Sequence, residues 1–334
     1  MLRKTFAVLV FGLGFFAAGY FSAPSAYRLF PAEDVAALPI SDSVSASTEP
    51  EEPIELRLLF AGDIMLSRSV GIAARRAGDP KHPFLKIGEF LRTADIAFAN
   101  LESPISSRGE NVGSIHSFRA DPQVVEGLVY AGFDALSFAN NHAWDYGRDA
   151  FRDTLAILRS NDISPVGAGE TYKEAHTPAV FERRGVAVAF LAYTTLLPKS
   201  LTSTTSIPAV AAPDALVADI ENTESQADII IVSFHWGEEY LPEHNKEQEA
   251  LAKAAIDAGA DLVIGHHPHV LQELEAYGGG YVAYSLGNFV FDQAFSEETM
   301  RSAVLEATVR DGRVSSARLI PVRINASFQP EVLE

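Results

Sequence analysis

The sequence predicts an α/β protein, and three observations support this fold class. A pattern of apolar strand and amphipathic helix recurs five times, a polar cluster stands at the end of each predicted strand, and predicted β-hairpins interrupt and finish the series. A chain of 334 residues with 47% hydrophobic content can bury a large core. Neither a repeat of fixed period nor a break in composition demands a second folded domain.

Residues 1–30 have the features of a signal peptide or a membrane anchor. Arg3 and Lys4 precede a long uncharged run, Phe6–Ala23. The candidate cleavage sites near its end are imperfect and the run is long for a signal peptide, so we favour an uncleaved anchor. In either case the remainder is expected to be exported. The basic N-terminal flank places the globular part outside the cytoplasm, tethered to the membrane or, after cleavage, secreted or periplasmic.

Residues 31–53 are rich in Ser, Ala, Pro and acidic residues and are expected to form a flexible tether. A folded domain is predicted over 54–334. Its strands are recognised by apolar or alternating runs and its helices by their 3.6-residue period. The expected elements are strand 55–61 and a helix ending at 77; helix 84–91 and strand 96–99; helix 122–131, strand 133–138 and helix 148–160; hairpin 179–182 and 186–193; helix 215–223 and strand 228–234; helix 246–258 and strand 262–264; and strands 270–276, 281–284, 301–310 and 313–322.

The stretch Asp261–His269 contains three of the nine histidines. A short apolar run ends at Gly265, which is expected to let the backbone turn sharply. In an extended segment, residues two apart point to the same side, so His267 and His269 are expected to reach one object. A metal ion is the object that imidazoles bind most often. A histidine-rich surface turn is the alternative, and the clustering favours the metal.

Composition limits the chemistry. The formal net charge of −18 argues against a nucleic-acid partner, because phosphate recognition needs an excess of Lys and Arg. An anionic substrate would have to be received by metal ions or by local basic groups. The chain has no cysteine, so disulfides and thiolate metal sites are excluded. One or two divalent ions held by nitrogen and oxygen ligands, namely Mn, Zn or Fe, are the expected cofactors.

Polar side chains follow five predicted strands. Because parallel strands of an α/β sheet share one carboxyl edge, residues far apart in sequence are expected to meet there. Taken singly, each has a structural explanation: Asp63 as a helix cap, Asn141 as a turn residue, His235 as a core histidine. Their recurrence at the same place favours a common site. The candidates are Asp63, Glu102, Asn141 with His142, His235, and His267 with His269.

Six short motifs occur along the chain in this order: Phe60–Asp63, Asn100–Pro104, Ala139–His142, Ser233–Gly237, Gly265–His269 and Ser285–Phe289. This ordered set resembles the CapA family, the poly-gamma-glutamate capsule biosynthesis or PgsA-like proteins, within the calcineurin-like metallophosphoesterase superfamily. The resemblance covers about residues 56–291 and implies a four-layer α-β-β-α sandwich of two mixed sheets with a di-metal centre at the strand ends.

The resemblance also implies individual roles. His142 would protonate the leaving group of a phosphoester, with Asp145 orienting its imidazole. Two ions about 3.5–4 Å apart would accept the charge of an in-line displacement at phosphorus. As metal ligands it implies Asp63 on the first ion, Glu102 bridging, Asn141 and His235 on the second ion, and His267 and His269 completing the two spheres.

Three departures from the superfamily pattern leave catalysis open. Met65 stands where a histidine is usual, Ala143 where an acid is usual, and Asn100-Leu101-Glu102 replaces the usual aspartate motif. The acidic pair Glu238 and Glu239 is explained more simply as an exposed turn than as a pocket wall.

The sequence therefore predicts an exported, membrane-tethered CapA-like protein acting in synthesis or export of an extracellular anionic polymer such as poly-gamma-glutamate, with a metal site for phosphoester hydrolysis. A non-catalytic, polymer-handling subunit of a membrane synthase complex is one alternative, and an exported nucleotidase-like phosphohydrolase is another.

Overall fold

The computed structural model describes residues 54–333 except 113–114, 199–200, 202–204 and 206. The chain divides into two units, Met1–Glu51 and Glu52–Glu334, and the described residues belong to the second. The predicted anchor (1–30) and tether (31–53) lie outside the described residues. Among the described residues, none of the helices has the length and apolar character needed to cross a bilayer.

The first sheet has eight strands and is mixed. Strands β1 to β4 run parallel, β14 to β16 continue the sheet antiparallel, and β13 pairs parallel with β1. In spatial order its strands are β16 (Pro330–Val332), β15 (Arg313–Ile324), β14 (Arg301–Arg310), β1 (Glu55–Ile64), β2 (Ile96–Leu101), β3 (Ala135–Ser137) and β4 (Ser164–Val166), with β13 (Asn288–Val290) beside β1.

The second sheet has six strands and is also mixed, with β7, β9, β10 and β12 parallel and the two edge strands antiparallel. A separate two-stranded ladder joins β5 (Ala168–Gly169) to β8 (Ile207–Pro208). In spatial order the six strands are β11 (Leu274–Tyr277), β12 (Gly280–Ala283), β10 (Leu262–His266), β9 (Ile229–His235), β7 (Val186–Thr194) and β6 (Ala179–Arg183).

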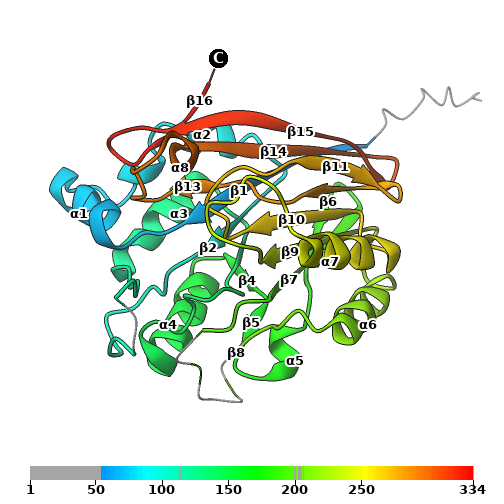
Figure 1. Cartoon of the computed structure of the whole chain (residues 1–334), viewed down its shortest axis with the longest axis horizontal. Helices are drawn as coiled ribbons and strands as arrows, with labels where there is room; N and C mark the ends of the chain where they lie inside the picture. Colours follow the sequence, from blue (N-terminus) through cyan, green and yellow to red (C-terminus); the bar gives the residue numbers. More distant parts are fainter. Residues whose placement is uncertain (1–53, 113–114, 199–200, 202–204, 206, 334) are drawn as a thin grey trace, which may run out of the picture. The chain divides into compact units, whose positions relative to one another are not determined.

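Helices cover the outer face of each sheet, and Figure 1 shows α6 and α7 together beside the second sheet. Buried residues from the first four helices pack on the first sheet, and those of α6 and α7 pack on the second. The helices are α1 (Arg68–Ala77), α2 (Gly88–Leu91), α3 (Val125–Ala131), α4 (Gly147–Ser160), α5 (Tyr172–Ala175), α6 (Pro213–Thr223), α7 (Lys246–Asp257) and α8 (Glu297–Met300), with three-ten turns η1 (His82–Phe84) and η2 (Pro122–Val124).

Three apolar cores separate these layers. Strand β1 contributes to two of them because its alternate residues face opposite sides: Leu58 and Phe60 enter the core between the sheets, and Leu59 enters the core under the helices. Phe98 and Phe190, from different sheets, stack at 5.3 Å in the inter-sheet core. The four-layer α-β-β-α sandwich of two mixed sheets is therefore confirmed.

One short segment crosses between the two sheets. Residues 284–287 link β12 in the second sheet to β13 in the first. The segment passes so close to both that a Cβ on Gly265 of β10 would lie 1.8 Å from the Tyr284 oxygen, and one on Gly62 of β1 would lie 2.0 Å from the Gly287 oxygen. Only glycine fits at either position. Gly265 is therefore needed for this close approach inside a strand, and the expectation that it makes a sharp turn is wrong.

Two other expectations also change. The predicted helix 84–91 is a three-ten turn followed by the short helix α2, although Phe84, Ile87 and Leu91 are buried as the period implies. The single carboxyl edge expected from the strand pattern is wrong, because the strands are divided between two sheets. The predicted polar residues therefore come from the carboxyl ends of strands in both sheets.

Candidate metal centre

The carboxyl ends of β1, β2 and β9 bring together Asp63, Glu102 and His235. One ligand atom from each residue lies within 4.8 Å of the others, and all three side chains are buried. Asp63 and Glu102 come from the first sheet and His235 ends a strand of the second. This group therefore spans the two sheets.

Asn100 connects the members of this group. Its amide nitrogen lies 2.8 Å from Asp63 Oδ1, 3.3 Å from Glu102 Oε2 and 3.3 Å from His235 Nδ1. Its own oxygen accepts from Asn140 Nδ2 at 3.1 Å. The register of β1 and β2 places Asn100 directly opposite Asp63. Asn100 thus fixes the orientation of both carboxylates.

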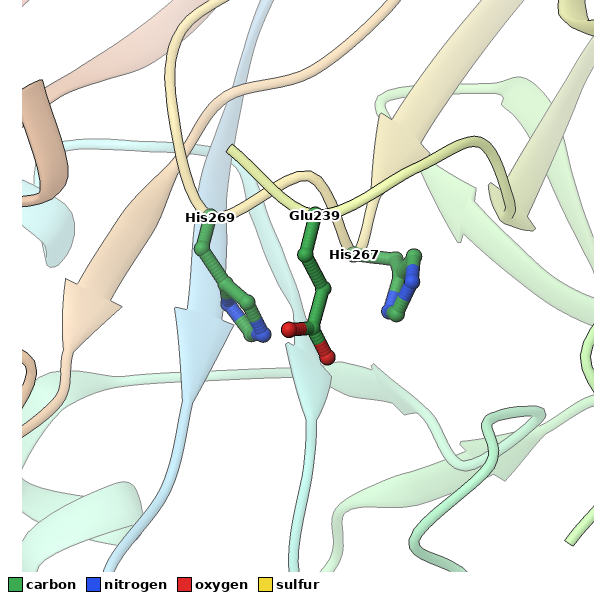
Figure 2. A group of neighbouring side chains, drawn as sticks. All are labelled: Glu239, His267 and His269. Carbon is green, nitrogen blue, oxygen red and sulfur yellow. The ribbon is translucent and has the colours of Figure 1, made fainter. Parts of the chain in front are cut away.

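A second group contains Glu239, His267 and His269, whose ligand atoms also lie within 4.8 Å of one another. Figure 2 shows the Glu239 carboxylate between the two imidazole rings, with the histidines on the turn after β10 and Glu239 on the loop after β9. Both histidines are buried, and Glu239 is exposed. The groups adjoin, because His269 Nδ1 lies 3.4 Å from Asp63 Oδ2 and His269 Nε2 lies 3.6 Å from Glu102 Oε1.

The backbone that carries these histidines is not extended. His267 and His269 have φ angles of 97° and 59°, in the left-handed region that side chains with a Cβ rarely adopt. The expectation of an extended segment is wrong, and a turn instead places the two rings on either side of the Glu239 carboxylate. Such backbone strain gathers at functional sites, where the surrounding structure maintains it. Here the His267 amide donates to Asp63 Oδ2 at 3.2 Å.

His142 and Asp145 form a pair beside the first group. His142 Nδ1 donates to Asp145 Oδ2 at 2.8 Å, and the opposite nitrogen, Nε2, lies 3.8 Å from Glu102 Oε1. The Phe118 ring stacks on the imidazole with centroids 4.1 Å apart, and its amide also donates to Asp145 Oδ2. The predicted orienting contact is present, and it turns Nε2 toward the carboxylates.

The remaining predicted ligand, Asn141, lies with its side-chain oxygen 2.9 Å from His235 Nε2. His269 is oriented from behind, since its Nδ1 lies 3.0 Å from Asn288 Oδ1. The structure therefore brings all eight predicted side chains into one connected cluster. Their roles as ligands or acids remain predictions.

The electrostatics of the cluster suit a cation. Burial opposes ionisation of Asp63, but contacts with His266 and His269 hold its pKa well below the usual value. Burial and the charge of Asp63 raise the pKa of Glu102 well above its usual value. Burial lowers the pKa of His235, and together with His269 it lowers that of His267 to about 3. Both imidazoles are therefore neutral at pH 7, the form that binds metals.

Some buried side-chain atoms have no hydrogen-bond partner within the described part of the chain, and they include Glu102 Oε1 and His267 Nδ1 of the cluster. Buried polar atoms almost always have partners, so an atom without one needs an explanation. The surrounding donors are carboxylate oxygens and imidazole nitrogens, the set that Zn, Mn and Fe accept. The residues present therefore fit a divalent ion.

Sequence reasoning gave no role to Asn100 and explained Glu239 as an exposed turn. Asn100 precedes Glu102 by two residues at the end of β2, and this same-face spacing was the available signal. Glu239 lies on a loop, where no periodicity indicates direction. Met65, the departure from the superfamily pattern, is buried in the core under the helices, and its sulfur accepts from the amide and the hydroxyl of Ser67.

The fold and the site define a four-layer α/β protein with a carboxylate- and imidazole-rich centre between two sheets. Over residues 57–293 the chain matches the family described as bacterial capsule synthesis protein PGA_cap. The chain belongs to this family, which confirms the resemblance noted in the sequence.

Two relatives and one solved structure illustrate the similarity. The chain is 35% identical over 290 residues to the capsule biosynthesis protein CapA of Bacillus anthracis, covering 84% of this chain and 70% of that protein. It is 34% identical over 272 residues to the PGA biosynthesis protein CapA of Bacillus subtilis, covering 80% and 71%. A hypothetical protein from Thermus thermophilus is similar in structure, with 19% identity, a TM-score of 0.51 and coverage of 80% of this chain and 98% of that one. This last likeness concerns the fold alone.

Proposed function

We propose that the chain is a metal-dependent phosphoester hydrolase that acts in synthesis or export of an extracellular anionic polymer such as poly-gamma-glutamate. The observation that supports the metal most directly is the pair of adjoining ligand groups, which includes the unpartnered Glu102 Oε1. The names of the Bacillus relatives, which refer to capsule and PGA biosynthesis, support the polymer. Arg3, Lys4 and the following apolar run support export and attachment to a membrane, beside the other subunits of a synthase complex.

In this proposal the chain's own residues position the substrate and move the proton. A divalent ion at the site would polarise the phosphoryl group and favour deprotonation of the attacking water. Water adds to phosphorus and releases one proton to solvent, the ester P–O bond breaks, and the doubly protonated His142 ring gives its Nε2 proton to the leaving oxygen while Nδ1–H stays bonded to Asp145. Asp145 holds the imidazole so that Nε2 faces Glu102. The stacked Phe118 ring keeps water from one face of the imidazole.

His142→Ala is the first test, made with the full chain purified in detergent and loaded with Mn or Zn. The expected result is a fall in kcat of about 10²- to 10⁴-fold against aryl phosphate mono- and diesters, because the general acid is lost. Metal content, measured by elemental analysis, should equal that of the parent, with anomalous scattering locating each ion. Turnover unchanged by the substitution would rule out this role, and a parent chain that binds no metal would rule out the hydrolase. Rapid turnover of nucleotides in the same panel would instead favour the nucleotidase.

Arg68 supplies positive charge beside the site of this strongly acidic chain. It begins α1 with a φ of 48°, its guanidinium lies 4.8 Å over the Phe118 ring, and Asp292 pairs with it. About a third of its side chain remains exposed. Among the causes acting on the pKa of Glu102, burial raises it most and Arg68 opposes the rise, so the Arg68 charge reaches the cluster. Arg68 is therefore placed to receive an anionic substrate.

For Arg68→Ala we expect kcat/KM for an anionic phosphoester to fall about 10- to 100-fold, mainly through KM, because a charge-assisted contact is lost. Steady-state kinetics at two salt concentrations checks this. Arg76→Ala is the matched control, since Arg76 is exposed on the last turn of the same helix. Equal kinetics for the two variants would show that Arg68 does not contact substrate.

A non-catalytic role in handling the polymer is the second candidate, and Met65 favours it. This position would carry a ligand in a phosphoesterase, but here its thioether is buried and bonded to Ser67. In cells that make the polymer, normal production by a Glu102→Gln, His267→Asn double variant, together with loss of production on deletion of 1–30, would favour this role over hydrolysis.

A further inference from the structure

We infer that Glu239 is a protein ligand of the ion held by His267 and His269, and that it makes this position the solvent-facing half of the centre. The inference rests on the proposed metal binding and extends it to a residue on an exposed loop. It assigns to Glu239 a role as metal ligand that the thioether of Met65 does not fill.

The first support is placement. The Glu239 carboxylate lies between the two imidazole rings, and one ligand atom of each residue falls within 4.8 Å of the others (Figure 2). One carboxylate and two imidazoles form a donor set that suits Zn, Mn or Fe, and harder ions such as Mg or Ca prefer oxygen alone.

The second support is that the loop is held against the histidine turn. The Trp236 amide donates to the His266 oxygen at 3.1 Å, and the Tyr240 amide donates to the Pro268 oxygen at 2.8 Å. These bonds come from residues on both sides of Glu239 in the sequence. The Tyr240 ring also packs 6.0 Å from that of His269. The position of Glu239 relative to the histidines is therefore fixed by the backbone, although its side chain is exposed.

The third support is charge. Glu239 stands beside His269, and the ring of His269 also lies 3.4 Å from Asp63 Oδ2 and 3.6 Å from Glu102 Oε1. Three carboxyl groups thus gather at one place, and the nearby cation Arg68 is paired with Asp292. Ionising all three would bring like charges together, and a divalent cation would relieve that repulsion.

The two groups also differ in exposure. Asp63, Glu102 and His235 are buried, whereas Glu239 reaches solvent. An ion bound by Glu239 can therefore exchange with solvent once the Glu239 carboxylate moves away. The group of Asp63, Glu102 and His235 has no exposed ligand that could move in this way. We expect the position that includes Glu239 to bind its ion more weakly and to lose it first to a chelator.

The test compares Glu239→Gln with the neighbouring control Glu238→Gln in the full chain purified in detergent. Both positions are exposed, so neither change is expected to alter folding, and thermal unfolding checks this. Each protein is stripped with a chelator and titrated with Mn²⁺ or Zn²⁺, with calorimetry giving affinity and elemental analysis giving ions per chain. We expect Glu239→Gln to lose one ion per chain or to bind it at least about tenfold more weakly, and Glu238→Gln to match the parent.

Glu239→Gln binding the same number of ions at the parent's affinities would overturn the inference and leave the proposed metal site intact. Equal weakening in both variants would also overturn it, because a general loss of negative charge would then explain the result. A parent chain that takes up no ion would instead defeat the proposed function itself.

Discussion

Glu102→Gln is expected to weaken metal binding by more than about 100-fold. Losing a residue that only hydrogen-bonds to a metal ligand costs about 10- to 100-fold, and losing a ligand itself should cost more. The substitution keeps the shape of the side chain and removes its charge. Glu102 is fully buried beside Asn100, His142 and His269, so its carboxylate lies among the other proposed residues of the site. Titration calorimetry with Mn²⁺ or Zn²⁺ measures the change.

The same substitution is expected to stabilise the metal-free chain. Burial and Asp63 raise the pKa of Glu102, so the folded state keeps a proton that the unfolded state has released at the same pH. Stability from this group is therefore full below the ordinary pKa and is lost as pH rises through the raised value. Glutamine cannot ionise, so the free energy of unfolding of the variant should exceed that of the parent at pH 7 to 8. Urea unfolding in a chelator checks this.

The pH dependence of metal binding by the parent chain is expected to run opposite to the pH dependence of its stability without metal. The ion needs the ionised carboxylate, so its binding should release protons and strengthen as pH rises, whereas Glu102→Gln should lose most of this dependence. Glu110→Gln, an exposed acid outside the site, is the control for charge removal. Unchanged affinity in Glu102→Gln would show that this carboxylate does not bind the ion.

Gly265→Ala is expected to destabilise the chain by more than about 4 kcal/mol or to prevent folding. The added carbon would lie 1.8 Å from the Tyr284 oxygen and 2.6 Å from the Trp236 ring nitrogen. Both neighbours are held in place, since Trp236 Nε1 donates to the Tyr284 oxygen at 3.0 Å. Relief would require the crossing segment to leave both sheets. Urea unfolding followed by circular dichroism measures the loss.

Gly279→Ala serves as the control for this prediction. Gly279 stands in the turn between β11 and β12 at a φ of 94°, and a carbon added there meets nothing within 4 Å. Its replacement should cost only the backbone strain, about 1 kcal/mol. An equal fall in the free energy of unfolding of the two variants would mean that the close approach at Gly265 does not add to the destabilisation.

The sequence predicts most strands, helices and members of the cluster because these depend on local pattern, whereas the four layers were implied by the family resemblance. Apolar runs locate the strands, and polar residues directly after them, such as Asp63 and His235, lie where strand ends must lie. The pattern does not show which strands share a sheet, since partners are chosen by contacts distant in sequence. For that reason the strand ends were expected along one edge and lie in two sheets.

Features that depend on three-dimensional contact were not predictable. The three-residue strand β13 is too short to show alternation, although its Asn288 pairs with Asp63 and orients His269. The requirement for Gly265 comes from a segment about twenty residues later in the chain. Glu239 lies on a loop whose direction is set by backbone bonds to the histidine turn.

The segment that passes from β12 to β13 has one more consequence. It runs against Gly62, the residue before Asp63, and against Gly265, two residues before His267, and it bonds to both strands. Separating the two sheets would therefore break the bonds that this segment makes to β1 and β10. The segment thus opposes a hinge motion between the sheets. Folding therefore brings together the residues that the two sheets contribute to the centre. The conformational entropy of ordering them is lost on folding and not when an ion binds.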